Sequence, residues 1–153
     1  MKNGDILENL TVKLYQKMGF DVEQDIILEG KSGSIHQIDV IAKKKSWRKK
    51  ETYFIECKLR TNSYVGKADV SNFLLALDDL EQKDGSVITN SRYSENALKI
   101  GERYNLNLIN GEELKNACRK YGIKYNIPDC SNDPVEYLVK TAFDFLGIGK
   151  QKA

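Results

Sequence analysis

The sequence is poor in the residues on which several classes of protein depend. Its 153 residues include one histidine (His36), two prolines and three cysteines. A single histidine leaves almost no material for a Ser–His or Cys–His catalytic pair. The cysteines, Cys57, Cys118 and Cys130, are odd in number and form no C-x-x-C pair. This argues against a disulfide scaffold and a cysteine zinc site, and it favours a reducing, cytoplasmic setting.

Long apolar runs and a strong charge imbalance are also missing. No run approaches the roughly 20 residues of a membrane-spanning helix, and the polar start of the chain is not a signal peptide, so we expect no membrane partner. The net charge is only +2, so any preference for nucleic acid depends on where the charges lie. An apolar fraction of 41% is enough for the core of one compact domain.

Helical and strand-like segments alternate along the chain. The segments whose apolar residues recur at helical spacing are 6–18, 70–80, 94–104 and 111–118. The short segments rich in apolar and β-branched residues are 20–28, 35–42, 52–59, 87–89 and 106–109. The predicted order is αβββαβαβα. Strands separated by helices are parallel neighbours, so we expect an α/β fold with a mixed central sheet flanked by helices.

The chain is predicted to have two parts, a compact domain over residues 1–124 and a linker with a C-terminal amphipathic helix over 125–153. Asp133 supplies an N-cap, Pro134 the first helical position and Glu136 an acid in the first turn. The apolar stripe of this helix has to be buried, either on its own domain or in a homodimer.

The strand-like segment 52–59 carries an acid and a lysine on one face. Side chains alternate along a strand, so Glu56 and Lys58 point the same way. If segments 35–42 and 52–59 pair as a hairpin, Asp39 approaches Glu56. Two carboxylates this close repel, and a hard divalent cation such as Mg²⁺ or Mn²⁺ relieves the repulsion. A carboxylate-bound metal beside a lysine suits phosphodiester hydrolysis. A surface ion pair between Glu56 and Lys58 is the plainer alternative.

Residues 37–42 (QIDVIA) and 53–58 (YFIECK) resemble the two-part signature of the PD-(D/E)XK nuclease superfamily. The nearest branch is similar to the Mrr-type restriction endonucleases and archaeal Holliday junction resolvases, and the resemblance covers roughly residues 4–118. It implies a restriction-endonuclease-like αβββαβ core, endonuclease activity, DNA as the partner and Mg²⁺ or Mn²⁺ as the cofactor. The proline that names the motif is absent, because Ile38 precedes Asp39.

Carried over residue by residue, the resemblance assigns the site. Asp39 and Glu56 match the metal-binding acids, Lys58 matches the catalytic lysine, and the backbone carbonyl of Cys57 would be a further metal ligand. Glu8, on the first helix, matches an acid that some members place near the metal. A solvated charge on that helix is the alternative for Glu8.

Residues 43–50 form a basic turn between two predicted strands. Six of its eight residues are cationic, and a tryptophan lies among them: Lys43, Lys44, Lys45, Trp47, Arg48, Lys49 and Lys50. Such a cluster neutralises phosphates, and a tryptophan can stack on an exposed base. The turn is therefore a predicted nucleic-acid contact, with a solubilising hairpin tip as the alternative.

Taken together, these patterns predict a metal-dependent DNA endonuclease. Two other interpretations stay open: a non-catalytic nucleic-acid-binding module of the same fold, and a nuclease subunit that is active only in a larger complex. The sequence defines neither the type of DNA substrate nor whether one or two metals bind.

Overall fold

The computed structural model describes residues 3–130. The helices in this part of the chain are α1 (Asn3–Lys17), α2 (Lys67–Asp79), α3 (Glu95–Arg103) and α4 (Gly111–Lys120). The strands are β1 (Asp21–Glu29), β2 (Ile35–Lys45), β3 (Lys50–Lys58), β4 (Gly85–Thr89) and β5 (Asn107–Ile109). Their order along the chain is the αβββαβαβα order that the sequence predicts.

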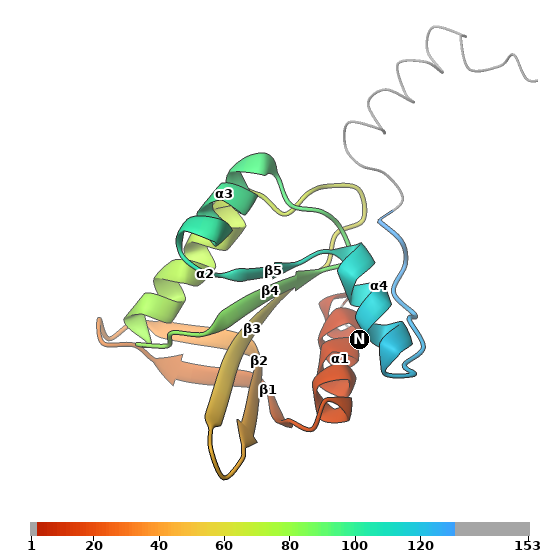
Figure 1. The fold of residues 1–153 in the computed structure, drawn as a ribbon. Helices are drawn as coiled ribbons and strands as arrows, with labels where there is room; N and C mark the ends of the chain where they lie inside the picture. Colours follow the sequence, from red (N-terminus) through yellow and green to blue (C-terminus); the bar gives the residue numbers. More distant parts are fainter. Residues whose placement is uncertain (1–2, 131–153) are drawn as a thin grey trace, which may run out of the picture.

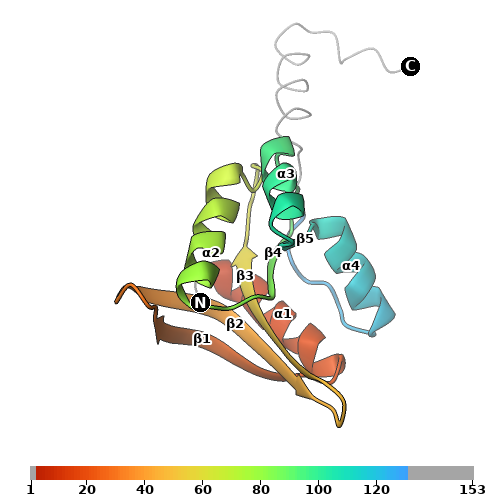
Figure 2. The ribbon, with the colours of Figure 1, turned by 60° about the vertical axis from the view of Figure 1, so that its left-hand side comes forward.

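One sheet joins the five strands in the order β1-β2-β3-β4-β5 (Figure 1). The first three strands are antiparallel neighbours, whereas β4 and β5 continue the sheet in parallel. α2 and α3 are the crossover helices that parallel pairing requires. The predicted mixed sheet with flanking helices is thus confirmed, and the end of the β2–β3 hairpin projects beyond the helices (Figure 2).

Two hydrophobic clusters lie on the two faces of the sheet. The first, below called the α1 side, gathers the stripe Leu7, Leu10 and Leu14 of α1 together with Leu114 of α4. The second, the α2 side, is formed by residues of α2 and α3 against the opposite face of β2, β3 and β4. The three leucines of α1 recur at spacings of three and four, so they share one face of the helix and are buried together.

The alternation of side chains in β1 and β2 reverses at one position. Val40 packs on the α1 side, but Ile38, only two residues earlier, packs on the α2 side. A regular strand would place both on the same face. β1 makes the same change between Val22 and Ile26, around Asp25, whose φ of 54° lies in the left-handed region. Both strands therefore change face together.

The turn between β1 and β2 is fastened to the end of α2 by Asp79. The Asp79 carboxylate accepts hydrogen bonds from the Ser32 backbone N–H at 2.8 Å and from the Ser32 hydroxyl at 2.7 Å. His36 Nε2 lies 2.6 Å from the same carboxylate. These bonds lower the pKa of Asp79, first through His36 and then through Ser32. The only histidine in the sequence is thus engaged in holding the β1–β2 arm in place.

The described chain ends on a segment that packs against the first cluster. Ile127 is buried there, and Tyr125 is half-buried beside it. The predicted C-terminal helix, from Val135 onward, falls outside the described residues. None of the helices between residues 3 and 130 has the length and apolar character that crossing a bilayer requires.

Candidate active site

Asp39 lies where β2 separates from β3. The ladder between the two strands ends at the pair Val40–Ile55. Beyond it, the Asp39 carboxylate replaces the next backbone partner, because its Oδ2 accepts a hydrogen bond from the Cys57 N–H at 2.8 Å. The two strands thus open into a fork, with the Asp39 carboxylate held across the opening.

The backbone of Cys57 faces this fork. In a strand, the N–H and C=O of one residue point toward the same neighbouring strand. Because the Cys57 N–H points at Asp39, the Cys57 carbonyl is directed to the same side. The next carbonyl, that of Lys58, points the other way and accepts a bond from Thr89 Oγ1 of β4 at 2.6 Å. The Cys57 side chain lies behind the strand, where Sγ is 3.5 Å from Thr11 Oγ1. Burial raises the pKa of this thiol and keeps it neutral.

Glu56 and Lys58 sit side by side on β3. Lys58 Nζ is 3.0 Å from Glu56 Oε1, and the two side chains are only 27% and 18% exposed. Burial raises the pKa of Glu56 to about 7, with a further increase from the charge of Asp39 that Lys58 partly offsets. Burial likewise raises the pKa of Asp39, against the opposing effect of the Cys57 N–H. The positive charge of Lys58 lowers both pKa values but does not fully offset burial.

Two further acids approach Asp39 from other elements. Single carboxylate oxygens of Glu8, Asp25 and Asp39 all lie within 4.8 Å of one another. Glu8 comes from α1, where its Oε2 accepts a bond from Gln24 Nε2 at 3.3 Å. Asp25 comes from β1, at the position facing Asp39, and its Oδ1 accepts a bond from Gln37 Nε2 at 3.4 Å. The structure thus brings the predicted acids Glu8, Asp39 and Glu56 to one region of the sheet.

Asp25 was missed by the sequence analysis. It belongs to no motif, and its membership depends on the left-handed φ at which β1 changes face. The one available signal is its residue type, because aspartate is depleted within strands. Its charge further raises the pKa of Asp39, after the larger effect of burial.

The donor set fits a hard divalent cation. It consists of carboxylate oxygens and a backbone carbonyl, which Mg²⁺ and Mn²⁺ prefer, with no histidine or thiolate among them. Burial raises the pKa values of Asp39 and Glu56, with a smaller increase at Glu56 from the charge of Asp39 and at Asp39 from the charge of Asp25. A cation between the carboxylates would relieve both penalties. The arrangement can therefore hold a metal next to an ammonium group, that of Lys58.

The basic turn lies at the far end of the same two strands. Trp47 is 85% exposed, and the guanidinium of Arg48 stacks 4.1 Å from its ring centre. Backbone and side-chain bonds between Ser46 and Lys49 close the turn tightly. The hairpin end therefore presents an ordered aromatic side chain to solvent.

The six cations of this turn are not equivalent. Lys44 donates to the Met18 carbonyl at 3.1 Å, and Lys49 pairs with Glu51 at 3.1 Å. Lys45 and Lys50, in contrast, face each other directly across the ladder. Like charges at such a position are destabilising, and a negatively charged ligand would relieve this repulsion.

Comparison with known proteins decides the family. A family model named Mrr_cat and described as a restriction endonuclease matches residues 3–118, more than half of the chain. The chain belongs to this family. The matched range contains the fork, the acids around it and the basic turn of this Mrr-type domain. No curated protein sequence matches the chain.

Two solved structures share the fold of this chain. A protein of unknown function, AF1548, superimposes with a TM-score of 0.71 at 21% identity, over 94% of this chain and 78% of that one. The protein VC1899 from Vibrio cholerae gives a TM-score of 0.52 at 16% identity, over 74% of this chain and 30% of that one. At these identities the likeness concerns the fold alone.

Proposed function

We propose that the chain is a metal-dependent endodeoxyribonuclease that hydrolyses phosphodiester bonds at the β2–β3 fork. Asp39, Glu56, the Cys57 carbonyl and Glu8 would hold Mg²⁺ or Mn²⁺. The observation that carries the proposal is the meeting of two acids of raised pKa with a half-buried lysine, in a member of a restriction endonuclease family.

The side chains at the fork have distinct tasks in this proposal. A bound divalent cation supplies a Lewis acid for a phosphate oxygen and lowers the pKa of a coordinated water. Asp39 is oriented by the Cys57 N–H, so its carboxylate needs no rearrangement to act as a ligand. Lys58 is held against Glu56 at 3.0 Å, which keeps its ammonium beside the site where charge develops on the phosphate.

The basic turn would bind the DNA backbone away from the fork. From Asp39 to Lys45 the strand advances six residues, or roughly 20 Å at 3.3 Å per residue. Duplex DNA rises 3.4 Å per base pair, so this contact would lie about six base pairs from the cleaved bond. Lys43, Lys45 and Lys50 would neutralise phosphates there, and Trp47 would stack on an exposed base.

Nicking of supercoiled plasmid DNA with and without Mg²⁺ tests the proposal. We expect the wild type to nick only with the metal, and Asp39→Asn to lose about 10³-fold in rate, because the ligand that spans the fork is neutralised. Asp78→Asn, at an exposed position of α2, is the matched control and should cut like the wild type. Circular dichroism confirms that each variant is folded.

Calorimetric titration with Mn²⁺ separates the endonuclease from a non-catalytic binding module. An endonuclease binds the metal through Asp39, so Asp39→Asn should bind it at least tenfold more weakly. Metal-independent nicking, or equal nicking by Asp39→Asn and the wild type, would refute the proposal. The homodimer, the C-terminal helix and the cytoplasmic setting stay predictions.

A further inference from the structure

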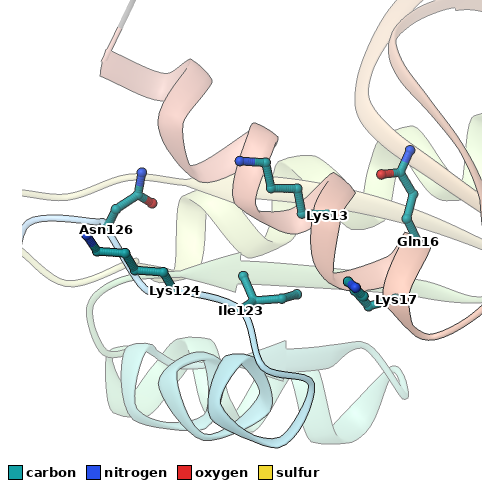
Figure 3. A pocket seen from close by; sticks show the side chains of 6 residues that line it. All are labelled: Lys13, Gln16, Lys17, Ile123, Lys124 and Asn126. Carbon is teal, nitrogen blue, oxygen red and sulfur yellow. The ribbon is translucent and has the colours of Figure 1, made fainter.

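A polar groove of about 580 Å³ runs between α1 and the segment that follows α4 (Figure 3). It is distinct from the fork, because none of the acids described above lines it. Three lysines, two carboxamides and one isoleucine form its walls: Lys13, Gln16, Lys17, Ile123, Lys124 and Asn126. None of the described residues that line it is acidic.

The α1 wall is a consequence of helical spacing. Leu7, Leu10 and Leu14 turn toward the core, which leaves Lys13 and Lys17 on an outward-facing stripe four residues apart. Like charges at this spacing repel each other and carry a small cost in helix stability. A ligand that carries negative charge would remove this cost.

The opposite wall is fixed by the way α4 ends. Gly122 has a φ of 66°, and its N–H and that of Ile123 donate to the Arg119 and Cys118 carbonyls. This is a Schellman motif, which needs glycine at the left-handed position and sets the direction of the chain after the helix. The wall is therefore not a loose loop.

Alternation then sorts the residues that follow. Ile123, Tyr125 and Ile127 pack on the first cluster, so the residues between them, Lys124 and Asn126, are turned outward. In the view of Figure 3, the Lys13 side chain extends from α1 toward Asn126 across the groove. Cations from two distant parts of the sequence thus converge on one space.

The polar side chains of this groove are unpaired within the part of the chain that the structure describes. Among residues 3–130, the side chains of Lys13, Lys17 and Lys124 make no ion pair, and those of Gln16 and Asn126 make no hydrogen bond. The one acid of the neighbouring segment, Asp129, is already paired with Lys115 at 2.6 Å. Converging ammonium and amide donors are therefore available to an anion with several acceptor oxygens.

We propose that this groove binds the sugar–phosphate backbone of the DNA substrate, as a second contact beside the fork. The proposal rests on the proposed function for the identity of the ligand. Along the axis of α1, Lys13 and Lys17 lie roughly 8–14 Å beyond Glu8 at 1.5 Å per residue, and at 3.6 residues per turn they lie on the other flank of the helix. The groove is therefore a contact separate from the one at the fork.

The salt dependence of DNA binding tests the groove. Fluorescence anisotropy of a labelled duplex of about 20 base pairs is measured in EDTA between about 50 and 200 mM salt. The variant Lys13→Gln/Lys124→Gln removes one cation from each wall. Each lost phosphate contact reduces the slope of log Kd against log salt by about 0.9, so we expect a decrease of about 1.8 and weaker binding. Lys83→Gln/Lys99→Gln, which removes the same charge on the α2–α3 side, should keep the wild-type slope.

An equal slope for both double variants would overturn the groove as a DNA contact. Inorganic tripolyphosphate is added in a second measurement of thermal stability. If the DNA slopes are equal and tripolyphosphate stabilises the wild type but not Lys13→Gln/Lys124→Gln, the groove binds a small anion and the proposal of a DNA contact is overturned. The titrations are repeated in Asp39→Asn, so that DNA binding is measured without cleavage. If the groove variant changes the salt slope but the wild type does not cleave DNA, only the nuclease proposal is rejected. If the wild type cleaves DNA but the groove variant keeps the wild-type slope, only the groove proposal is rejected.

Discussion

β3 carries a lysine at each end, and the two ends treat the same charge in opposite ways. Lys58, at the fork, is 27% exposed and paired with Glu56. Lys50, at the hairpin end, is exposed and lies opposite Lys45. The two lysines are separated by an even number of positions, so their side chains lie on the same face of β3. At the fork, burial strengthens the interactions between charges and raises the pKa values of Asp39 and Glu56. At the hairpin end, charges stay in water and respond to salt.

Of the changes that compare the two ends of β3, replacing Lys58 should have the largest effect. Lys58→Gln removes the ammonium beside the developing phosphate charge, so we expect the rate of cleavage at saturating DNA to fall by about 10²–10³-fold. It also removes an interaction that lowers the pKa of Glu56, so the pH profile of the cleavage rate should shift to higher pH. Single-turnover cleavage across pH measures both. If Lys58→Gln changed only the salt dependence of DNA binding, the distinction between the two ends would fail.

Glu56 should make the metal-free protein less stable as the pH rises. Its pKa is about 7 in the fold and about 4.5 when unfolded, so between these values the unfolded chain has released a proton that the fold retains. Glu56→Gln should therefore be more stable than the wild type above pH 7, by about 1–3 kcal/mol, and equal to it below pH 4.5. Urea unfolding in EDTA measures the difference.

Glu51, at the hairpin end of the same strand, is the matched control. A hydrogen bond from Lys49 lowers the pKa of Glu51, so its contribution has the opposite sign: it is present above the unfolded pKa and is lost as the pH falls through the folded value. A Glu56→Gln variant that lost stability at high pH would contradict the assigned effect of burial.

The smallest effect is expected at the hairpin end. Lys45→Gln/Lys50→Gln removes the facing like charges, so stability should rise by about 0.2–1 kcal/mol. DNA affinity should fall by about tenfold near 100 mM salt, with a slope about 1.8 smaller. Lys44→Gln is the control, because Lys44 is bound to the Met18 carbonyl and should influence folding more than the slope. Anisotropy at several salt concentrations distinguishes them, and equal slopes would exclude DNA from the hairpin end.

The fork could be foreseen because its determinants are local. The spacing of apolar residues predicts β2 and β3, and the short polar turn between them makes a hairpin that brings Asp39 near Glu56. The family resemblance then points to Glu8, which the structure places beside Asp39. The catalytic and metal-binding roles of these residues stay proposals, whereas the order of elements, the sheet and the family are confirmed.

Other features depend on contacts between distant segments, which periodicity cannot report. The basic turn reads as six similar cations, but Lys44 reaches its partner, the Met18 carbonyl, only when the chain folds. Asp25 joins the acids through a left-handed residue in a strand, a conformation that no turn motif announces. The polar groove between α1 and the segment after α4 is lined by residues as far apart in the sequence as Lys13 and Lys124. In the sequence, each wall alone looks like an ordinary solvated surface.

Because β1 and β2 change face at the same position, the alternation of side chains is set separately in the two halves of the first hairpin. In β1, Val22 before Asp25 packs on the α1 side, whereas Ile26 and Leu28 after it pack on the α2 side. Because a one-residue shift turns a strand over, deleting a residue ahead of Asp25 would misplace Val22 but leave Ile26 and Leu28 seated. The same deletion after Asp25 would do the reverse. The acids near the fork thus lie at the boundary between two halves of the hairpin, and a deletion in one half leaves the packing of the other half in place.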